Sequence, residues 1–310
     1  MRNFFKKYKW FLVGLLACLI SAPNNTVMKF SSQEISPNMF NIIRFGFVAA
    51  FTLPLLVRHI RRLKGIALKY SIISAVFMCV AVMVWPWAIA KSTASYASVL
   101  TLLSPVIFII LSVKIDRQSL NRHSLAGISL AAAGAFLIVA IPILINQPNS
   151  QFVFYPFATL LIAINLIVFP LAVIYMKKVH QAGVPLVSVI SLTSWITLFV
   201  TITLMALLNE KILLGTVTSS NILAPLYSGF VVGLIARFLN VISYEKIGSV
   251  ATSALGYVEV LGAVLLPVII LGETLSWEMV VGGVLILLGV YFVEHHKSSH
   301  HKFHHSLKHH

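Results

Sequence analysis

The sequence is poor in charge, in acidic residues and in cysteine. Only 10% of its 310 residues are charged, eight residues are acidic and two are cysteines. Soluble domains carry about 25% charged residues, so this composition excludes a soluble enzyme. Two cysteines exclude a disulfide-rich secreted scaffold, and 59% apolar residues exclude a disordered chain.

Long apolar runs take the place of the missing charge, and the mean hydropathy is +0.94. A transmembrane helix needs about 20 apolar residues, and polar breaks divide the chain into ten such stretches. They are Trp10–Phe30, Pro37–Leu56, Ile66–Ala90, Ala94–Val113, His123–Ile145, Phe152–Met176, Pro185–Leu208, Ile222–Tyr244, Val250–Leu271 and Trp277–Glu294. The sequence therefore predicts an all-α polytopic membrane protein with ten transmembrane helices.

Basic residues are distributed unevenly between the two sides of the predicted bundle. Most of the 23 fall in the termini and in alternate connections, whereas Lys29, Lys91 and Lys211 fall on the other side. Since basic residues gather in cytoplasmic loops, this asymmetry predicts a multi-pass protein of the cytoplasmic (inner) membrane with both termini inside. The net charge of +15 then marks orientation and contact with membrane lipids, not binding of nucleic acid.

The two halves of the chain resemble each other. With an offset of 155 residues, Gly127 falls on Gly282 and Gly134 on Gly289. Five spans per half is an odd number, so the second half is inverted relative to the first, an architecture typical of transporters. We predict a first five-helix repeat at 10–146, a second, inverted five-helix repeat at 152–294 and a His/Lys-rich cytoplasmic tail at 295–310.

Several motifs carry a resemblance to the EamA-like ten-helix branch of the drug/metabolite transporter superfamily. Ser36–Phe45 resembles the start of its second helix, and Val258–Ser276 resembles its ninth helix and the following loop. Leu103–Val106 matches the related motif of the first half, where Gln118 replaces the usual glutamate. The resemblance covers residues 10–294 and implies transport of amino acids or related metabolites, usually in the export direction.

The sequence departs from this family pattern where a substrate would bind. Ser21–Asn25 replaces the first-helix Trp-Gly-Ser-Asn stretch, Val260 replaces the proline after the ninth-helix glutamate, and Arg237 matches no family motif. The resemblance therefore does not specify which substrate is carried.

Arg44, Arg237 and Glu259 are charged residues that lie deep inside predicted spans, away from the span ends. Each would cost about 2.5–3.5 kcal/mol if it faced lipid, so they must pair, reach carbonyl groups or line water. Glu259 lies on a stripe with Thr252, Gly256 and Ala263 at helical spacing, and we expect this stripe to face a cavity. Glu259 is a candidate for proton coupling or for binding a charged substrate, with a structural ion pair as the alternative.

Polar and aromatic residues near the predicted helix breaks complete the candidate site. Asn24 and Asn25 follow Pro23, while Ser98 and Thr101 precede a kink at Pro105. The predicted substrate-binding residues are Asn24, Asn25, Trp85, Ser98, Thr101, Arg237, Asn240, Tyr257 and Glu259, and the predicted structural or coupling residues are Arg44, Glu259 and Pro105. Packing, satisfaction of the helix breaks and an interfacial aromatic belt are the structural alternatives for these residues.

We expect a secondary transporter, acting as an exporter, that moves small organic metabolites such as amino acids by alternating access. Two alternatives remain open: a proton-coupled exporter of cationic compounds or drugs, and a membrane scaffold or receptor that transports nothing. The sequence contains no phosphate-binding loop or catalytic constellation, and its spans contain no histidines at metal-ligand spacing, so we expect no enzymatic activity, cofactor or metal. For the His-rich tail, a solvated segment is the expected interpretation, with metal binding or pH sensing as the alternative. The oligomeric state stays open.

Overall fold

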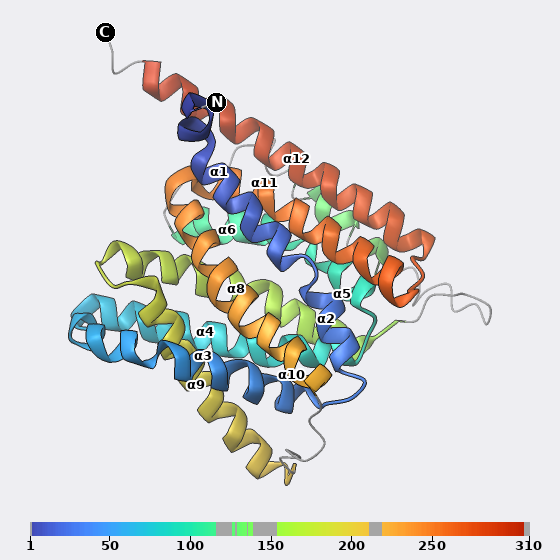
Figure 1. Ribbon diagram of the computed structural model, residues 1–310. Coiled ribbons are helices and arrows are strands. Elements are labelled where there is room, and N and C mark those ends of the chain that lie inside the picture. The colour runs from blue at the N-terminus through green and yellow to red at the C-terminus, as the bar shows by residue number, and fades with distance from the viewer. Residues whose placement is uncertain are drawn as a thin grey trace.

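The computed structural model describes residues 2–115, 126–127, 129–134, 136–138, 154–210 and 219–306, and these form helices joined by short turns (Figure 1). The helices of the first half are α1 (Arg2–Ser21), α2 (Asn24–Ser31), α3 (Pro37–His59), α4 (Gly65–Ala90), α5 (Ala94–Thr101), α6 (Ser104–Ile115) and the segment Ser129–Ile138. Those of the second half are α8 (Pro156–Gln181), α9 (Leu186–Leu207), α10 (Ser219–Leu226), the π-helix η3 (Tyr227–Ala236), α11 (Arg237–Leu271) and α12 (Trp277–Ser306).

Seven helical segments in the described residues are long and apolar enough to cross a membrane, and three shorter apolar helices accompany them. The seven are Lys9–Ser31, Pro37–Arg62, Gly65–Ala90, Ala94–Ile115, Pro156–Gln181, Leu186–Leu207 and Ile222–Ile247. The shorter ones are Ser129–Ile138, Val258–Leu271 and Trp277–Gly289. The polytopic helical class is thus confirmed, whereas ten full spans remain a prediction.

The outer surface of the bundle carries large apolar side chains. Phe51, Phe199, Leu207 and Ile269 are 62%, 72%, 75% and 76% exposed. Many large apolar side chains are exposed on this surface, which suits contact with lipid. The surface therefore agrees with the membrane location that the hydropathy predicts.

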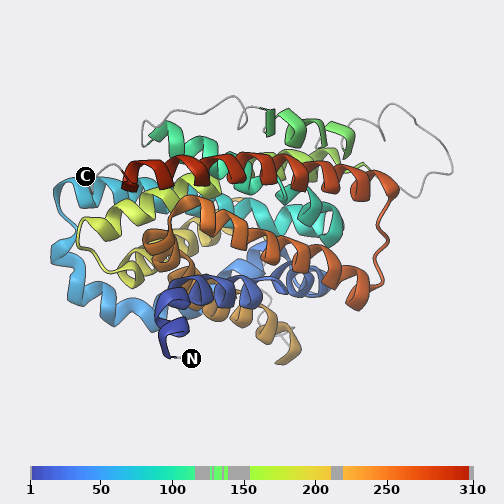
Figure 2. The same ribbon diagram turned by 90° about the horizontal axis from the view of Figure 1, so that it is seen from above.

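The helices pack in a pattern that is preserved when the two halves are exchanged. α3 packs against α9, its counterpart in the other half, and α4 packs against α8 as α1 packs against η3 and α11. The start of α1 and the end of α12 lie at the same end of the bundle in both views (Figures 1 and 2). The fold thus brings corresponding helices of the two repeats together along one interface.

Two helices are interrupted near their middle. α1 ends at Ser21 and α2 begins at Asn24, because Pro23 has no backbone N–H to continue the ladder. The Tyr227 hydroxyl donates a hydrogen bond to the carbonyl oxygen of Ile20 at this interruption. A second interruption at Leu102 and Leu103 separates α5 from α6.

Two predicted helix ends differ from the structure. The expected break between Tyr244 and Val250 is absent: α11 is helical without interruption, and Figure 1 shows the orange ribbon turning back within it. That segment contains no proline, and no described residue in it has a positive φ, so nothing local forces the backbone out of helical conformation. α12 also continues past Glu294 to Ser306, where its side chains, like those of the rest of the His-rich tail, lie outside the described residues.

One end of the bundle is tied together by charged side chains at helix termini. The Glu273 carboxylate accepts hydrogen bonds from the N–H groups of Ala94 and Ser95 at the start of α5, at 2.9 and 2.7 Å. Glu210 accepts from the Ser36 hydroxyl and, at 2.7 Å, from the Asn38 amide at the start of α3. These acidic groups from the second half complement the positive ends of two first-half helix dipoles.

Candidate functional site

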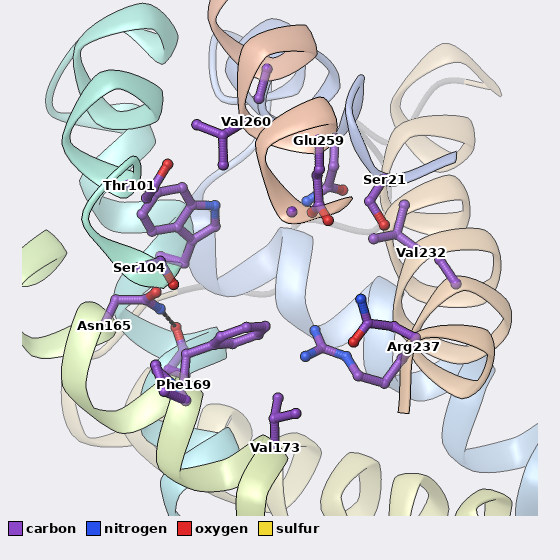
Figure 3. Close-up of a pocket in the computed structure, with 18 of the residues that line it drawn as sticks. Ser21, Thr101, Ser104, Asn165, Phe169, Val173, Val232, Arg237, Glu259 and Val260 are labelled. Carbon is purple, nitrogen blue, oxygen red and sulfur yellow. Dashed lines mark hydrogen bonds between the residues drawn. The ribbon is translucent and has the colours of Figure 1, made fainter. Parts of the chain in front are cut away.

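A cavity of about 240 Å³ lies between the two halves of the bundle (Figure 3). Its wall is made by α1, α2, α3, α4, α5, α6, α8, η3 and α11. Polar and charged groups on this wall come from Ser21, Asn24, Asn25, Arg44, Trp85, Thr101, Ser104, Asn165, Arg237, Asn240, Thr252 and Glu259. Ser21 and Asn24 flank the first helix interruption, and Thr101 and Ser104 flank the second. The two interrupted helices therefore meet at the cavity.

Three charged side chains line this cavity: Arg44, Arg237 and Glu259. Among the described residues, none of these side chains forms an ion pair or a hydrogen bond with a protein group. Figure 3 shows the side chains of Arg237 and Glu259 pointing into the same space from two separate stretches of α11. Charges of both signs therefore face one small volume without neutralising each other through direct contact.

Arg237 is held over an aromatic ring. Its guanidinium carbon lies 4.4 Å from the centroid of the Phe169 ring, which Figure 3 places on the opposite wall. Such cation–π contact orients a guanidinium without using its N–H groups. The donors of Arg237 therefore stay available to the cavity.

The predicted polar stripe of α11 lines the cavity in full. Thr252, Gly256, Glu259 and Ala263 are all part of its wall. The helical spacing of three and four residues puts them on one face, and the neighbouring Val260 also lines the cavity. The sequence pattern was sufficient to predict which of these residues share a face, because the whole stripe belongs to one uninterrupted helix.

A short hydrogen-bond chain fixes the polar groups beside the first interruption. The Trp85 indole N–H donates to Asn25 Oδ1 at 3.1 Å, and Asn25 Nδ2 donates to Ser98 Oγ at 2.9 Å. Thr101 Oγ1 in turn donates to the Ser98 carbonyl oxygen at 2.7 Å. Trp85, Asn25 and Thr101 line the cavity, whereas Ser98 is fully buried behind the wall.

Most of the residues predicted for the site meet at this one cavity. Asn24, Asn25, Trp85, Thr101, Arg237, Asn240, Glu259 and Arg44 all line it. Ser98 contributes through Asn25. The side chains of Tyr257 and Pro105 lie outside the described part of the structure. Whether the residues on this wall bind a substrate stays a prediction.

The sequence analysis did not select the contribution of α8. Asn165, Phe169 and Pro170 line the cavity, and Asn165 Nδ2 donates to the Ala81 carbonyl oxygen at 2.9 Å. An amide within an apolar span, one turn before an aromatic residue and a proline, was a usable signal. Phe108 and Ser104 of α6 also line the cavity.

Arg44 is 5% exposed, and its Nε atom is buried without a hydrogen-bond partner. Two glycines of η3 allow the close approach of α3 at this point. A Cβ on Gly229 would lie 2.6 Å from the Arg44 carbonyl oxygen, and a Cβ on Gly233 would lie 3.7 Å from Arg44 Nη2.

The described residues contain no group of three or more side chains that could hold a metal ion.

The chain matches a family model and is similar to solved structures. The model of the EamA-like transporter family matches residues 8–140 and 156–294. No curated protein matches the chain by sequence. A crystal structure superimposes with a TM-score of 0.64 over 92% of this chain and 96% of that chain, at 17% sequence identity. This structural likeness shows the shared fold.

Proposed function

Because the chain belongs to the EamA-like transporter family, we propose that it is a secondary transporter that exports small organic metabolites such as amino acids. The family assigns transport of small molecules across a membrane. The direction, the substrate class and the mechanism are the proposed parts, and they are argued below from the cavity.

The observation that carries the proposal is the pair of opposite charges in the cavity. Arg237 and Glu259 face the same volume of about 240 Å³, and neither is neutralised by an ion pair within the described chain. Each charge would cost about 2.5–3.5 kcal/mol if it faced lipid, and inside the bundle it still needs water or a ligand to replace its lost hydration. A substrate that carries both an ammonium and a carboxylate group would offset this cost at both residues.

The size and charge of the cavity favour a metabolite over a drug-like cation. Drug-sized ligands occupy pockets of about 300–1,000 Å³, and this cavity is smaller. Two arginines and one glutamate give the wall an excess of positive charge. This excess would repel a cationic substrate, so an exporter of cationic compounds is the less favoured alternative.

The interrupted helices and the ties at one end support alternating access. The breaks beside Ser21 and Thr101 adjoin the cavity, as discontinuous helices do at transporter sites. At one end, Glu210 and Glu273 of the second half hold the starts of α3 and α5. We propose that release of these hydrogen bonds accompanies opening of the cavity toward that end.

The experiment that tests the proposal begins with a thermal-shift screen of the purified protein against metabolites. A compound that raises the melting temperature is then assayed for uptake into proteoliposomes. We expect Glu259→Gln and Arg237→Ala to lower uptake at least tenfold, and Glu34→Gln, an exposed acidic residue, to leave it unchanged. Unchanged uptake in both cavity variants would contradict the assigned roles.

Two further measurements separate the alternatives. Uptake of a cationic compound that competes with protons, abolished by Glu259→Gln, would favour proton-coupled cation export. Cysteines placed along α11 in the cavity wall would stay inaccessible to water-soluble thiol reagents from both sides if the protein were a non-transporting scaffold.

A further inference from the structure

A second, smaller chamber of about 30 Å³ adjoins the cavity, with Arg44, Val82 and Arg237 shared between the two walls. Its remaining wall comes from α3, α4, α8, α9 and η3. The other lining residues are Phe45, Val48, Met78, Met176, Ile190, Thr193, Ser194, Gly229 and Gly233. The two arginines are the charged members of this wall, and no acidic residue belongs to it.

Among the described residues, no group forms a hydrogen bond or ion pair with the two guanidinium groups in the chamber wall. The Arg44 side chain is 5% exposed, and its Nε atom has no hydrogen-bond partner. Arg237 contacts the Phe169 ring through its guanidinium face, which leaves the edge with its N–H groups free of described partners. Two guanidinium groups beside one chamber repel each other unless an anion lies between them.

The hydroxyl groups of the chamber are neutral, so they do not balance the charge of the two arginines. Thr193 Oγ1 donates to the Val189 carbonyl oxygen at 2.9 Å, and Ser194 Oγ donates to the Ile190 carbonyl oxygen at 2.8 Å. Both therefore serve their own helix, α9. The side chains with N–H groups in the chamber wall are those of the two arginines.

Two glycines of η3, Gly229 and Gly233, line the chamber and lie close to Arg44. A side chain at Gly233 would begin 3.7 Å from Arg44 Nη2, and at Gly229 it would collide with the Arg44 backbone. π-Helical segments occur frequently at functional sites. Here the segment places two residues without side chains against the one buried arginine of α3.

We propose that the chamber between Arg44 and Arg237 binds a small monovalent anion. A volume of about 30 Å³ admits a chloride-sized ion or the oxygens of one carboxylate group, and a single water needs about 10–15 Å³ by the same kind of measure. The anion is either a free ion or the carboxylate of the transported molecule. Only the second source rests on the proposed transport function.

Binding is tested on the purified full-length protein by thermal shift, without any transport assay. Sodium chloride and sodium acetate are titrated at constant ionic strength against sodium methanesulfonate, whose anion is larger and has no carboxylate group. We expect chloride or acetate to raise the melting temperature in a saturable manner. A shift with chloride identifies a free anion as a sufficient ligand, and a shift with acetate alone identifies a carboxylate. Melting temperatures equal to those in methanesulfonate would overturn the proposal.

Variants locate the binding site. Arg44→Gln and Arg237→Gln each remove one guanidinium, and the apparent Kd is expected to rise about tenfold or more. Lys69→Gln removes the same charge from an exposed position of α4 and should leave the Kd unchanged. A full anion response in Arg237→Gln would also overturn the assignment.

A second pair of variants keeps the test decisive if Arg44→Gln does not fold. Ser194→Val adds volume inside the chamber, and Ser191→Val adds the same volume to a buried position of α9 that lines neither cavity. We expect loss of the anion response in the first variant and its retention in the second. Failure to find any transported metabolite would leave these binding data unaffected, so the two proposals fail separately.

Discussion

Gly134 and Gly282 lie in direct backbone contact: a Cβ on Gly282 would be 2.7 Å from the Gly134 carbonyl oxygen, and one on Gly134 would be 2.6 Å from that of Gly282. A Cβ on Gly289 would likewise lie 2.5 Å from the Gly127 carbonyl oxygen. The repeat aligns Gly127 with Gly282 and Gly134 with Gly289, whereas the contacts pair them crosswise. A two-fold relation between antiparallel helices of the two repeats produces this crosswise pairing.

This contact predicts that Gly282→Ala destabilises the bundle. The added methyl group would lie 2.4 Å from Ile138 Cγ1 as well as against the Gly134 backbone, and such overpacking costs about 1–3 kcal/mol. Thermal unfolding of the detergent-solubilised protein should show a lower midpoint. Gly46→Ala is the control, because a Cβ there meets nothing within 4 Å; an equal loss in both variants would contradict the packing argument.

The Glu273 carboxylate predicts a charge effect at the start of α5. In Glu273→Gln the hydrogen bonds to Ala94 and Ser95 lose their ionic character, and the stabilisation of the helix dipole disappears, at a cost of about 0.5–2 kcal/mol. The melting temperature should fall. Glu34→Gln, at an exposed position, should melt as the wild type does.

Trp85 and Trp87 provide a matched pair for the cavity. Both indoles donate to an asparagine oxygen, Trp85 to Asn25 at 3.1 Å and Trp87 to Asn38 at 3.2 Å, but only Trp85 lines the cavity. Trp85→Phe leaves the Asn25 oxygen unpaired, and substrate affinity should fall about tenfold. Trp87→Phe should lower the melting temperature with the affinity unchanged. Equal affinities in the two variants would place substrate binding elsewhere.

The hydrogen bonds that Glu210 and Glu273 accept at the starts of α3 and α5 predict how access to the cavity is controlled. A cysteine at Thr101, in a protein in which the buried Cys18 and Cys79 are replaced by alanine, reports cavity access to a membrane-impermeant thiol reagent. In Glu210→Ala/Glu273→Ala, labelling from the end at which these residues lie should become faster than in the parent protein. Labelling at the parent rate would show that the ties do not control access.

Several parts of the fold and of the candidate site follow from local sequence. The stripe from Thr252 to Ala263 lines the cavity as its spacing predicts, and the first helix breaks at Pro23 because proline cannot donate to the ladder. The change of direction between Tyr244 and Val250 was predicted, but the helical conformation that continues through it was not. A polar connection signals a change of direction, but whether the backbone leaves its helical conformation there depends on the helices packed around it.

The sequence alone determined that this protein lies in a membrane, that its halves repeat, and that Arg44, Arg237 and Glu259 are its costly charges. These conclusions need only composition, spacing and the energy of burying charge. Tertiary structure decided that the three charges share one cavity without ion pairs among the described residues, and that Arg44 and Arg237 also face a second chamber. The distance between residues on different helices depends on how those helices cross, which no spacing within a single helix encodes.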